Sequence, residues 1–345
     1  MERDSIKPRI GYVCALLSAL LFGINGSLTK VVVHAGLTAA QFTLFRLVSA
    51  SVIAGVVLLL VDRRGFAVGW RRLSQFALLG VTGMALLQFT YARALELLPV
   101  GITLLIQHSA VLLVALIAYF FFHEKVKPRL WVSIGCVLLG LAVVAQVWQS
   151  DLNPVGVLVA VAAALSLTIY FVGGEHAVGK TSPLVALFWT MSFAAAFWLI
   201  FSAWWEIDPG LLAHTVALTG HLNSVVVPLW VPVGWNLAFG SFLPFYLSFI
   251  SLKHLSATTA GIVGCSEVIF AFLVAWLWLG EELDLAQLLG AGVVLVGIVL
   301  AQTARVPRSG SNDLAEKPRV AASEEPEEFS DANLGTLERL PQVRD

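Results

Sequence analysis

The chain of 345 residues is 58% hydrophobic and only 12% charged, with a formal net charge of −1 and a mean hydropathy of +0.86. Soluble domains carry about 25% charged residues, so this chain cannot cover a folded surface with ionised groups, and much of that surface must face lipid. The net charge lacks the basic excess that a nucleic-acid-binding surface needs, which excludes a nucleic-acid partner.

Runs of mostly apolar residues follow one another along the chain, each long enough to cross the hydrocarbon core of a bilayer as a helix of about 20 residues. The ten runs are residues 10–30, 37–61, 74–95, 99–122, 129–148, 154–174, 183–204, 229–251, 257–279 and 285–304. The backbone groups of such segments must be satisfied internally in lipid. The sequence therefore predicts an all-α polytopic membrane protein of ten transmembrane helices.

The connections between the runs predict the orientation of the chain. Arginines and lysines gather before the first run, within residues 63–72 and within residues 125–129, whereas residues 205–208 and 281–284 on the opposite side are acidic. Because positive loops stay in the cytoplasm, we expect both termini to be cytoplasmic. Residues 205–228 form the longest outside connection, for which at most a short interfacial helix is indicated.

The C-terminal segment, residues 305–345, differs in kind from the rest of the chain. It is polar, with four glutamates within residues 324–328, and it has too few apolar residues to bury a core. We expect it to be a disordered cytoplasmic tail.

An internal repeat relates the two halves of the apolar region. A shift of 157 positions aligns the pairs Ser109 and Ser266, Glu124 and Glu281, Gly135 and Gly292, Val137 and Val294, and Gly140 and Gly297. The repeats are residues 1–150 and 151–304, each with five runs. Because five is odd, the second repeat must be inverted relative to the first, which is the architecture of many secondary transporters.

Two segments resemble a known family. Tyr91–Leu95 followed by residues 101–124, and Leu243–Tyr246 followed by residues 257–281, are similar to the EamA-like carriers of the drug/metabolite transporter superfamily. The resemblance implies a 5+5 inverted repeat with a pocket between spans 1–4 and 6–9, and with spans 5 and 10 at the periphery. It also implies export of amino acids, other small metabolites or drug-like solutes.

Ionisable residues at membrane depth are candidates for the solute site, because each costs roughly 2.5–3.5 kcal/mol to insert. Glu267 lies near the middle of the ninth run, and His108 lies at comparable depth in the fourth. They are interpreted either as a proton- or amine-sensitive pair in the transport path or as satisfied core groups. Arg46, inside the second run, is expected to pair with Glu267 or with a solute carboxylate.

Further polar and aromatic residues in the runs complete the predicted substrate-binding set. They supply hydrogen bonds or aromatic walls, although each one alone is also typical of core packing; they are Asn25, Gln88, Tyr91, Gln107, Tyr170, Trp189, Tyr246 and Ser266. In the eighth run Pro232, Gly240 and Pro244 predict a broken helix at a binding site or a packed kink.

Small residues recur at heptad spacing in the fifth and tenth runs, at Ser133 and Gly140 and at Gly290 and Gly297. They favour either close packing of helices within the chain or a dimer interface. The sequence thus leaves a monomer and a homodimer open, with membrane lipids and a small solute as the expected partners.

One motif match is rejected. Residues 174–181 fit the nucleotide-binding pattern GxxxxGK[ST] letter for letter, but they follow a membrane helix instead of a β-strand, so no nucleotide is expected. No cofactor or metal is expected either, and a carrier, not an enzyme, is favoured. The alternatives are a membrane-embedded enzyme or a sensor that uses His108 and Glu267 as a polar site. The compartment expected for the carrier is a bacterial inner membrane.

Overall fold

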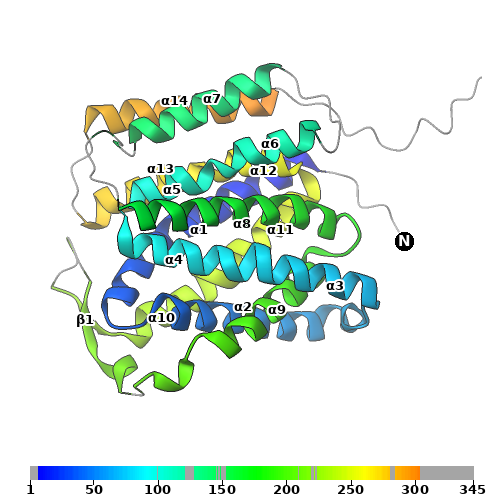
Figure 1. Cartoon of the computed structure of the whole chain (residues 1–345), viewed down its shortest axis with the longest axis vertical. Coiled ribbons are helices and arrows are strands. Elements are labelled where there is room, and N and C mark those ends of the chain that lie inside the picture. The colour runs from blue at the N-terminus through cyan, green and yellow to red at the C-terminus, as the bar shows by residue number, and fades with distance from the viewer. Residues whose placement is uncertain are drawn as a thin grey trace, which may run out of the picture. The chain divides into compact units, whose positions relative to one another are not determined.

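In a computed structural model of the chain, the described residues are 7–98, 100–120, 128–144, 146, 148, 153–208, 210–218, 221, 224–279 and 284–303. They form a bundle of helices with one small hairpin (Figure 1). Glu124 and Glu281, which the sequence repeat pairs, and the tail expected at residues 305–345 fall outside these residues.

Within the described ranges, eight helical stretches are long and apolar enough to cross a membrane. Four are single α-helices: α1 (Pro8–His34), α2 (Ala39–Val61), α8 (Pro154–Val178) and α9 (Pro183–Phe201). The fifth and tenth predicted runs form α7 (Pro128–Val144) and α14 (Leu285–Thr303), which contain shorter apolar helices. Lipid-facing positions are apolar as the composition requires; Leu158 and Leu139, for example, are 70% and 68% exposed.

The other four stretches are interrupted helices. The third comprises α3 (Trp70–Leu79), the π-helical segment η2 (Gly80–Ala85) and α4 (Leu86–Leu97), and the fourth comprises α5 (Val100–His108) and α6 (Ala110–Phe120). The later pair repeats this order with α10 (Trp230–Leu237), the π-helical segment η7 (Ala238–Phe242) and α11 (Leu243–His254), and then α12 (Ala257–Gly264), α13 (Ser266–Val274) and the π-helical segment η8 (Ala275–Leu279). The breaks thus recur at matching places in the two halves.

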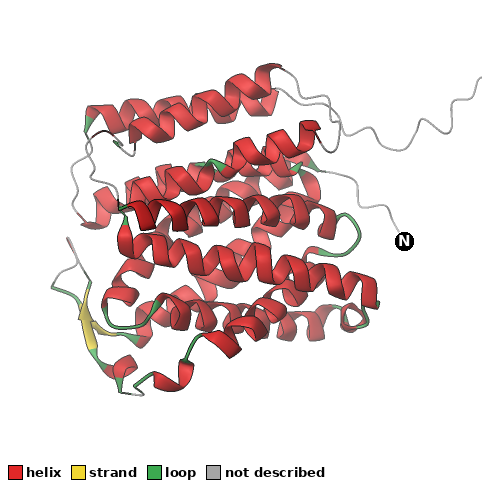
Figure 2. Ribbon diagram, viewed as in Figure 1, coloured by secondary structure: helices red, strands yellow, loops and turns green. Residues whose placement is uncertain are grey.

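Local sequence explains where several helices begin. Thr38 and Gln41 form a reciprocal capping box at the start of α2. Asn153 and Ser182 accept hydrogen bonds from the first turns of α8 and α9, and proline follows each cap at the first helical position. The connection between α9 and α10 differs from the expectation of at most a short helix. Besides short helical turns, it holds an antiparallel hairpin of β1 (Thr215–Ala217) and β2 (Val226–Pro228) (Figure 2).

Helices α7 and α14 pack side by side (Figure 1) through contacts that the repeat relates to one another. A Cβ atom on Gly140 would lie 2.8 Å from both Gly290 O and Val294 N, and one on Gly297 would lie 3.0 Å from Ser133 O and 3.1 Å from Val137 N. Shifting the first set of contacts by 157 positions gives the second. The small residues predicted to make flat helix faces therefore pack against each other within one chain.

Replacing Gly140 or Gly297 by alanine is expected to destabilise the protein by about 1–3 kcal/mol, because the added methyl group overpacks a backbone contact. Gly135 and Gly292 are matched controls, since a Cβ on either meets nothing within 4 Å. Alanine there should leave stability unchanged or raise it slightly through helix propensity. The melting temperatures of the purified variants in one detergent measure both effects on stability. Equal decreases in melting temperature at all four glycines would contradict this packing.

Candidate functional site

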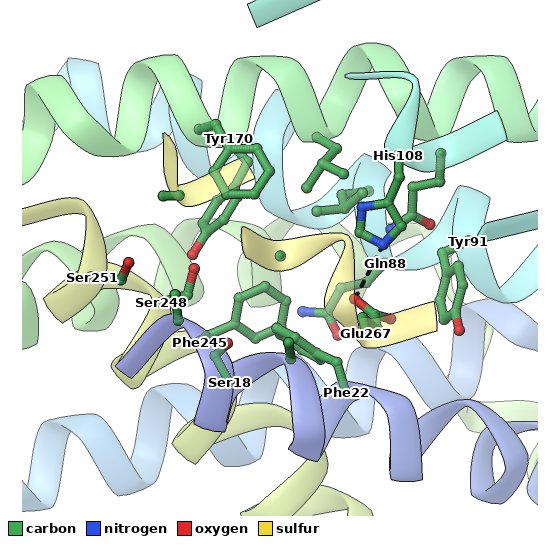
Figure 3. Close-up of a pocket in the computed structure, with 18 of the residues that line it drawn as sticks. Ser18, Phe22, Gln88, Tyr91, His108, Tyr170, Phe245, Ser248, Ser251 and Glu267 are labelled. Carbon is green, nitrogen blue, oxygen red and sulfur yellow. Dashed lines mark ion pairs between the residues drawn. The ribbon is translucent and has the colours of Figure 1, made fainter. Parts of the chain in front are cut away.

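A cavity of about 70 Å³ lies within the bundle and is lined by α1, α2, α4, α5, α8, α11, α12 and α13. This volume holds several water molecules. Figure 3 shows Gln88, Tyr91, His108 and Glu267 gathered at one end, here called the polar end, and Tyr170, Ser248 and Ser251 at the other, here called the hydroxyl end. No lining residue comes from α7, α9 or α14 among the residues described.

His108 and Glu267 face each other across the polar end, with His108 Nε2 3.5 Å from Glu267 Oε2 (Figure 3). Both are buried, with 2% and 8% of their surfaces exposed. His108 ends α5, directly before the break at Ser109, and Glu267 lies in the first turn of α13, directly after the break at Cys265. A cation at a helix C-terminus and an anion at an N-terminus are each stabilised by the helix dipole.

The Arg46 side chain donates hydrogen bonds to the interrupted helix of the eighth run. Pro244 has no N–H, so the Gly240 carbonyl, four residues earlier, loses its intrahelical partner. Arg46 Nη2 donates to this carbonyl at 3.0 Å, and Arg46 Nε donates to Ser241 Oγ at 2.9 Å. Asn25 Nδ2 adds a donor to the same carbonyl at 3.3 Å. Among the described residues no ion pair joins Arg46 to Glu267; the carboxylate pairs with His108 instead.

Several cavity-lining polar atoms have no hydrogen-bond partner among the described residues. They include both amide atoms of Gln88, the Tyr91 hydroxyl, Gln107 Oε1 and the Ser251 hydroxyl. Leaving a buried polar atom unsatisfied costs about 1–3 kcal/mol, and native proteins keep few of them. Their concentration around one cavity indicates a site that water or a polar solute completes.

Aromatic rings form the wall between the two ends. Phe22 and Phe245 meet edge to face with ring centroids 4.8 Å apart, and the Tyr170 ring lies 5.8 Å from Phe245 and 5.5 Å from Phe249. The cavity therefore offers a carboxylate and amides at one end, aromatic faces along its side and hydroxyl groups at the other end. Such a combination suits an amphipathic solute.

Most of the predicted site residues meet at this cavity: Asn25, Arg46, Tyr91, Gln107, His108, Tyr170 and Glu267 all line it. Three others do not. Ser266 Oγ donates to Val263 O of the preceding helix α12, Trp189 Nε1 donates to Gly65 O at 3.2 Å, and Tyr246 stacks on Phe242. Gln88, also expected to supply hydrogen bonds, lines the cavity as well. Ser18 and Ser248 line it without having been predicted, and the only sequence signal for them was a polar residue within an apolar run.

The nucleotide-like segment has a structural use in this fold. Its first residues end α8, so a helix leads into it where a nucleotide loop requires a strand. Glu175 Oε2 accepts a hydrogen bond from Ala257 N at 2.8 Å and so caps α12. The described residues hold no group of three or more His, Cys, Asp or Glu side chains suited to a metal ion.

Comparisons with known proteins agree with this architecture. The sequence model of the EamA-like transporter family matches residues 9–146 and 154–303. An uncharacterized transporter of Archaeoglobus fulgidus is 24% identical over 226 residues, which are 64% of this chain and 74% of that protein. The uncharacterized transporter YdfC of Bacillus subtilis is 24% identical over 273 residues, 76% of this chain and 81% of that protein.

A solved crystal structure has the same fold. It superposes with a TM-score of 0.66 at 18% sequence identity, and the match covers 88% of this chain and 98% of that one. The two matched segments of the family model divide the chain between residues 146 and 154, where the sequence predicts the boundary between repeats.

Proposed function

The chain belongs to the EamA-like transporter family, and from that membership we propose that it is a secondary carrier that moves a small organic solute through the central cavity by alternating access. The observation that carries the proposal is the polar end of the cavity. There a buried ion pair from two interrupted helices lies near Gln88 and Tyr91, whose polar side-chain atoms have no partner among the described residues.

The proposed architecture has ten spans in two inverted repeats of five, with both termini on the cytoplasmic face. Three features support it. The π-helical segments η2 and η7 begin 158 residues apart, and the breaks at Ser109 and Cys265 occur 156 residues apart, close to the 157-residue shift of the sequence repeat. The reciprocal glycine contacts of α7 and α14 are those expected around a two-fold axis, as in an isologous interface. In this arrangement α7 and α14 are the fifth and tenth spans.

In the proposed mechanism, the segments that move are the helices interrupted near mid-membrane. Half-helix ends present unpaired backbone groups and dipoles to a solute, and inverted repeats let one site face either side in turn. We place His108 and Glu267 at that site, because each ends or begins a half-helix and the two come from different repeats. The protein is a multi-pass membrane protein, and the proposed location is a bacterial cytoplasmic membrane.

The proposed solutes are amino acids, other small metabolites or drug-like compounds that carry an amine. Glu267 is the acidic side chain that lines the cavity, whereas Arg46 already donates to Gly240 and Ser241. An amine next to Glu267, with an apolar portion against Phe22 and Phe245, matches the two chemistries present. The test is uptake of a labelled amino-acid and amine panel, including a cationic dye, by liposomes containing the purified full chain. Lack of flux for every compound would count against this solute class.

Replacing Gln88 by leucine is expected to affect stability and transport in opposite directions. Gln88 is 2% exposed and both its amide atoms lack a partner among the described residues, so an apolar group of similar size removes a desolvation cost of about 1–3 kcal/mol. The solute-free protein should melt at a higher temperature while solute flux falls. A variant that melts lower and transports normally would show that Gln88 is an ordinary packing residue.

A further inference from the structure

Two connections that are far apart in sequence enclose a second, basic pocket at one end of the bundle. Residues from the connection after α2 and the first turn of α3, within 62–72, and residues from the start of α9, within 180–185, line an open pocket of about 580 Å³. Its cationic side chains are Arg64, Arg71, Arg72 and Lys180. We refer to it as the basic pocket.

The charge in the basic pocket is poorly compensated. In the described part of the chain none of the four cations forms an ion pair with a carboxylate. The acidic lining residue is Asp62, whose Oδ1 accepts a hydrogen bond from the backbone N–H of Arg64 at 3.1 Å. Lys180 Nζ lies 3.5 Å from His176 Nε2, which adds no negative charge. An anion would therefore be stabilised here.

An apolar groove continues from this pocket between α3 and α8. It has a volume of about 400 Å³ and shares Arg72, Lys180 and Thr181 with the basic pocket. Its walls include Leu78 and Ile169, which are 67% and 42% exposed, and both lie on helical stretches long enough to cross a membrane. The groove thus opens on a surface that faces lipid.

Trp70 indicates the level of the basic pocket in the bilayer. It lines the pocket, begins α3 and is 80% exposed, as is typical of tryptophans at the headgroup level of a bilayer. Helix α9 begins beside it after the Ser182 cap, and the N-terminal dipole of this helix adds to the positive potential. Basic pockets between transmembrane helices are a recurrent way of binding lipid headgroups.

We propose that the basic pocket and the groove together bind one anionic glycerophospholipid, with its phosphate among Arg71, Arg72 and Lys180 and an acyl chain along Leu78 and Ile169. The cations supply positive charge that balances the phosphate. The residues shared by the basic pocket and the groove make these two volumes continuous, which a free phosphate or nucleotide would not need. Lys180 and Thr181, which close the rejected nucleotide-like motif, line both volumes, and Lys180 supplies one of the cations. The proposal is independent of solute transport.

The test compares lipid retention by the purified full chain in detergent, measured by native mass spectrometry and by melting, with added phosphatidylglycerol or phosphatidylcholine. Wild-type protein should retain phosphatidylglycerol preferentially and melt higher in its presence. The variant R71Q/R72Q/K180Q should lose about fivefold in affinity for each cation removed, roughly 100-fold in all. All three side chains lie at the surface, and melting without lipid checks that the variant is folded.

Arg63→Gln is the matched control. Arg63 belongs to the same connection but lies outside the lining, and its Nε donates to Leu59 O at 3.1 Å. This variant should retain phosphatidylglycerol like wild type. Leu78→Gln should reduce the retention of phosphatidylglycerol, because it changes the groove and leaves the basic pocket intact. Equal lipid retention by the triple variant and wild type would overturn the proposal. So would stabilisation by inorganic phosphate as strong as that by the lipid, because the site would then be one for a soluble anion.

Discussion

Replacing Glu267 by glutamine is expected to reduce solute flux roughly 10- to 150-fold, while the melting temperature of the purified protein changes little. The range follows from about 1.5–3 kcal/mol for a charge-assisted hydrogen bond to a solute cation. Glutamine keeps the shape of the side chain and can still hydrogen-bond to His108, so the bundle loses little packing. The measurement is the initial rate of uptake into liposomes, normalised to the amount of inserted protein.

Glu206→Gln is the control for this experiment. Glu206 is exposed in the short helical turn after α9 and does not line the cavity, so its loss should leave flux unchanged. Equal rates for wild type and Glu267→Gln would remove the carboxylate from the transport path and leave its ion pair with His108 as a structural contact.

Replacing Arg46 by methionine should destabilise the protein by about 3 kcal/mol, because two hydrogen bonds from a buried guanidinium disappear together. These bonds hold α2 to η7, where Pro244 has left the Gly240 carbonyl without its helical donor. Methionine preserves much of the apolar length of the side chain, so the loss reports the bonds and not a cavity. Denaturant unfolding in a fixed detergent, followed by tryptophan fluorescence, gives the free energy.

Arg93→Met separates this effect from the general removal of an arginine in a membrane helix. Arg93 lies on α4 with its side chain 49% exposed and pairs with Glu96 one turn away. Such exposed pairs contribute less than about 1 kcal/mol, so this variant should unfold close to wild type. Similar losses of unfolding free energy at both positions would contradict the conclusion that the hydrogen bonds of Arg46 hold α2 to η7.

The positions of the apolar spans were predictable because hydropathy over about 20 residues is a direct consequence of bilayer thickness. The similar places of His108 and Glu267 within their apolar runs led to the expectation that they form a pair. The structure brings these residues, 159 positions apart in the sequence, within 3.5 Å of each other, measured from His108 Nε2 to Glu267 Oε2. The hairpin at β1 and β2 lies outside the spans, where hydropathy gives no register.

Which side of each helix faces the cavity was not readable. Each residue of a helix turns by about 100°, so Ser266 and its neighbour Glu267 point in different directions, and the carboxylate alone lines the cavity. The π-helical segments add a further shift. Segment η2 lies just before Gln88 and Tyr91 and changes the face that they present, relative to an unbroken α-helix. A sequence pattern that assumes a regular period therefore cannot separate Gln88 and Tyr91, which line the cavity, from predicted residues such as Tyr246, which do not.

The most direct test of the carrier mechanism is the sidedness of access to the central cavity. Ser248 lines the hydroxyl end, and a Ser248→Cys variant can be made after Cys14, Cys136 and Cys265 are replaced by alanine. A membrane-impermeant thiol reagent is then added to right-side-out and to inside-out vesicles. Alternating access predicts that the cysteine reacts from both sides, and reaction from one side alone would contradict it.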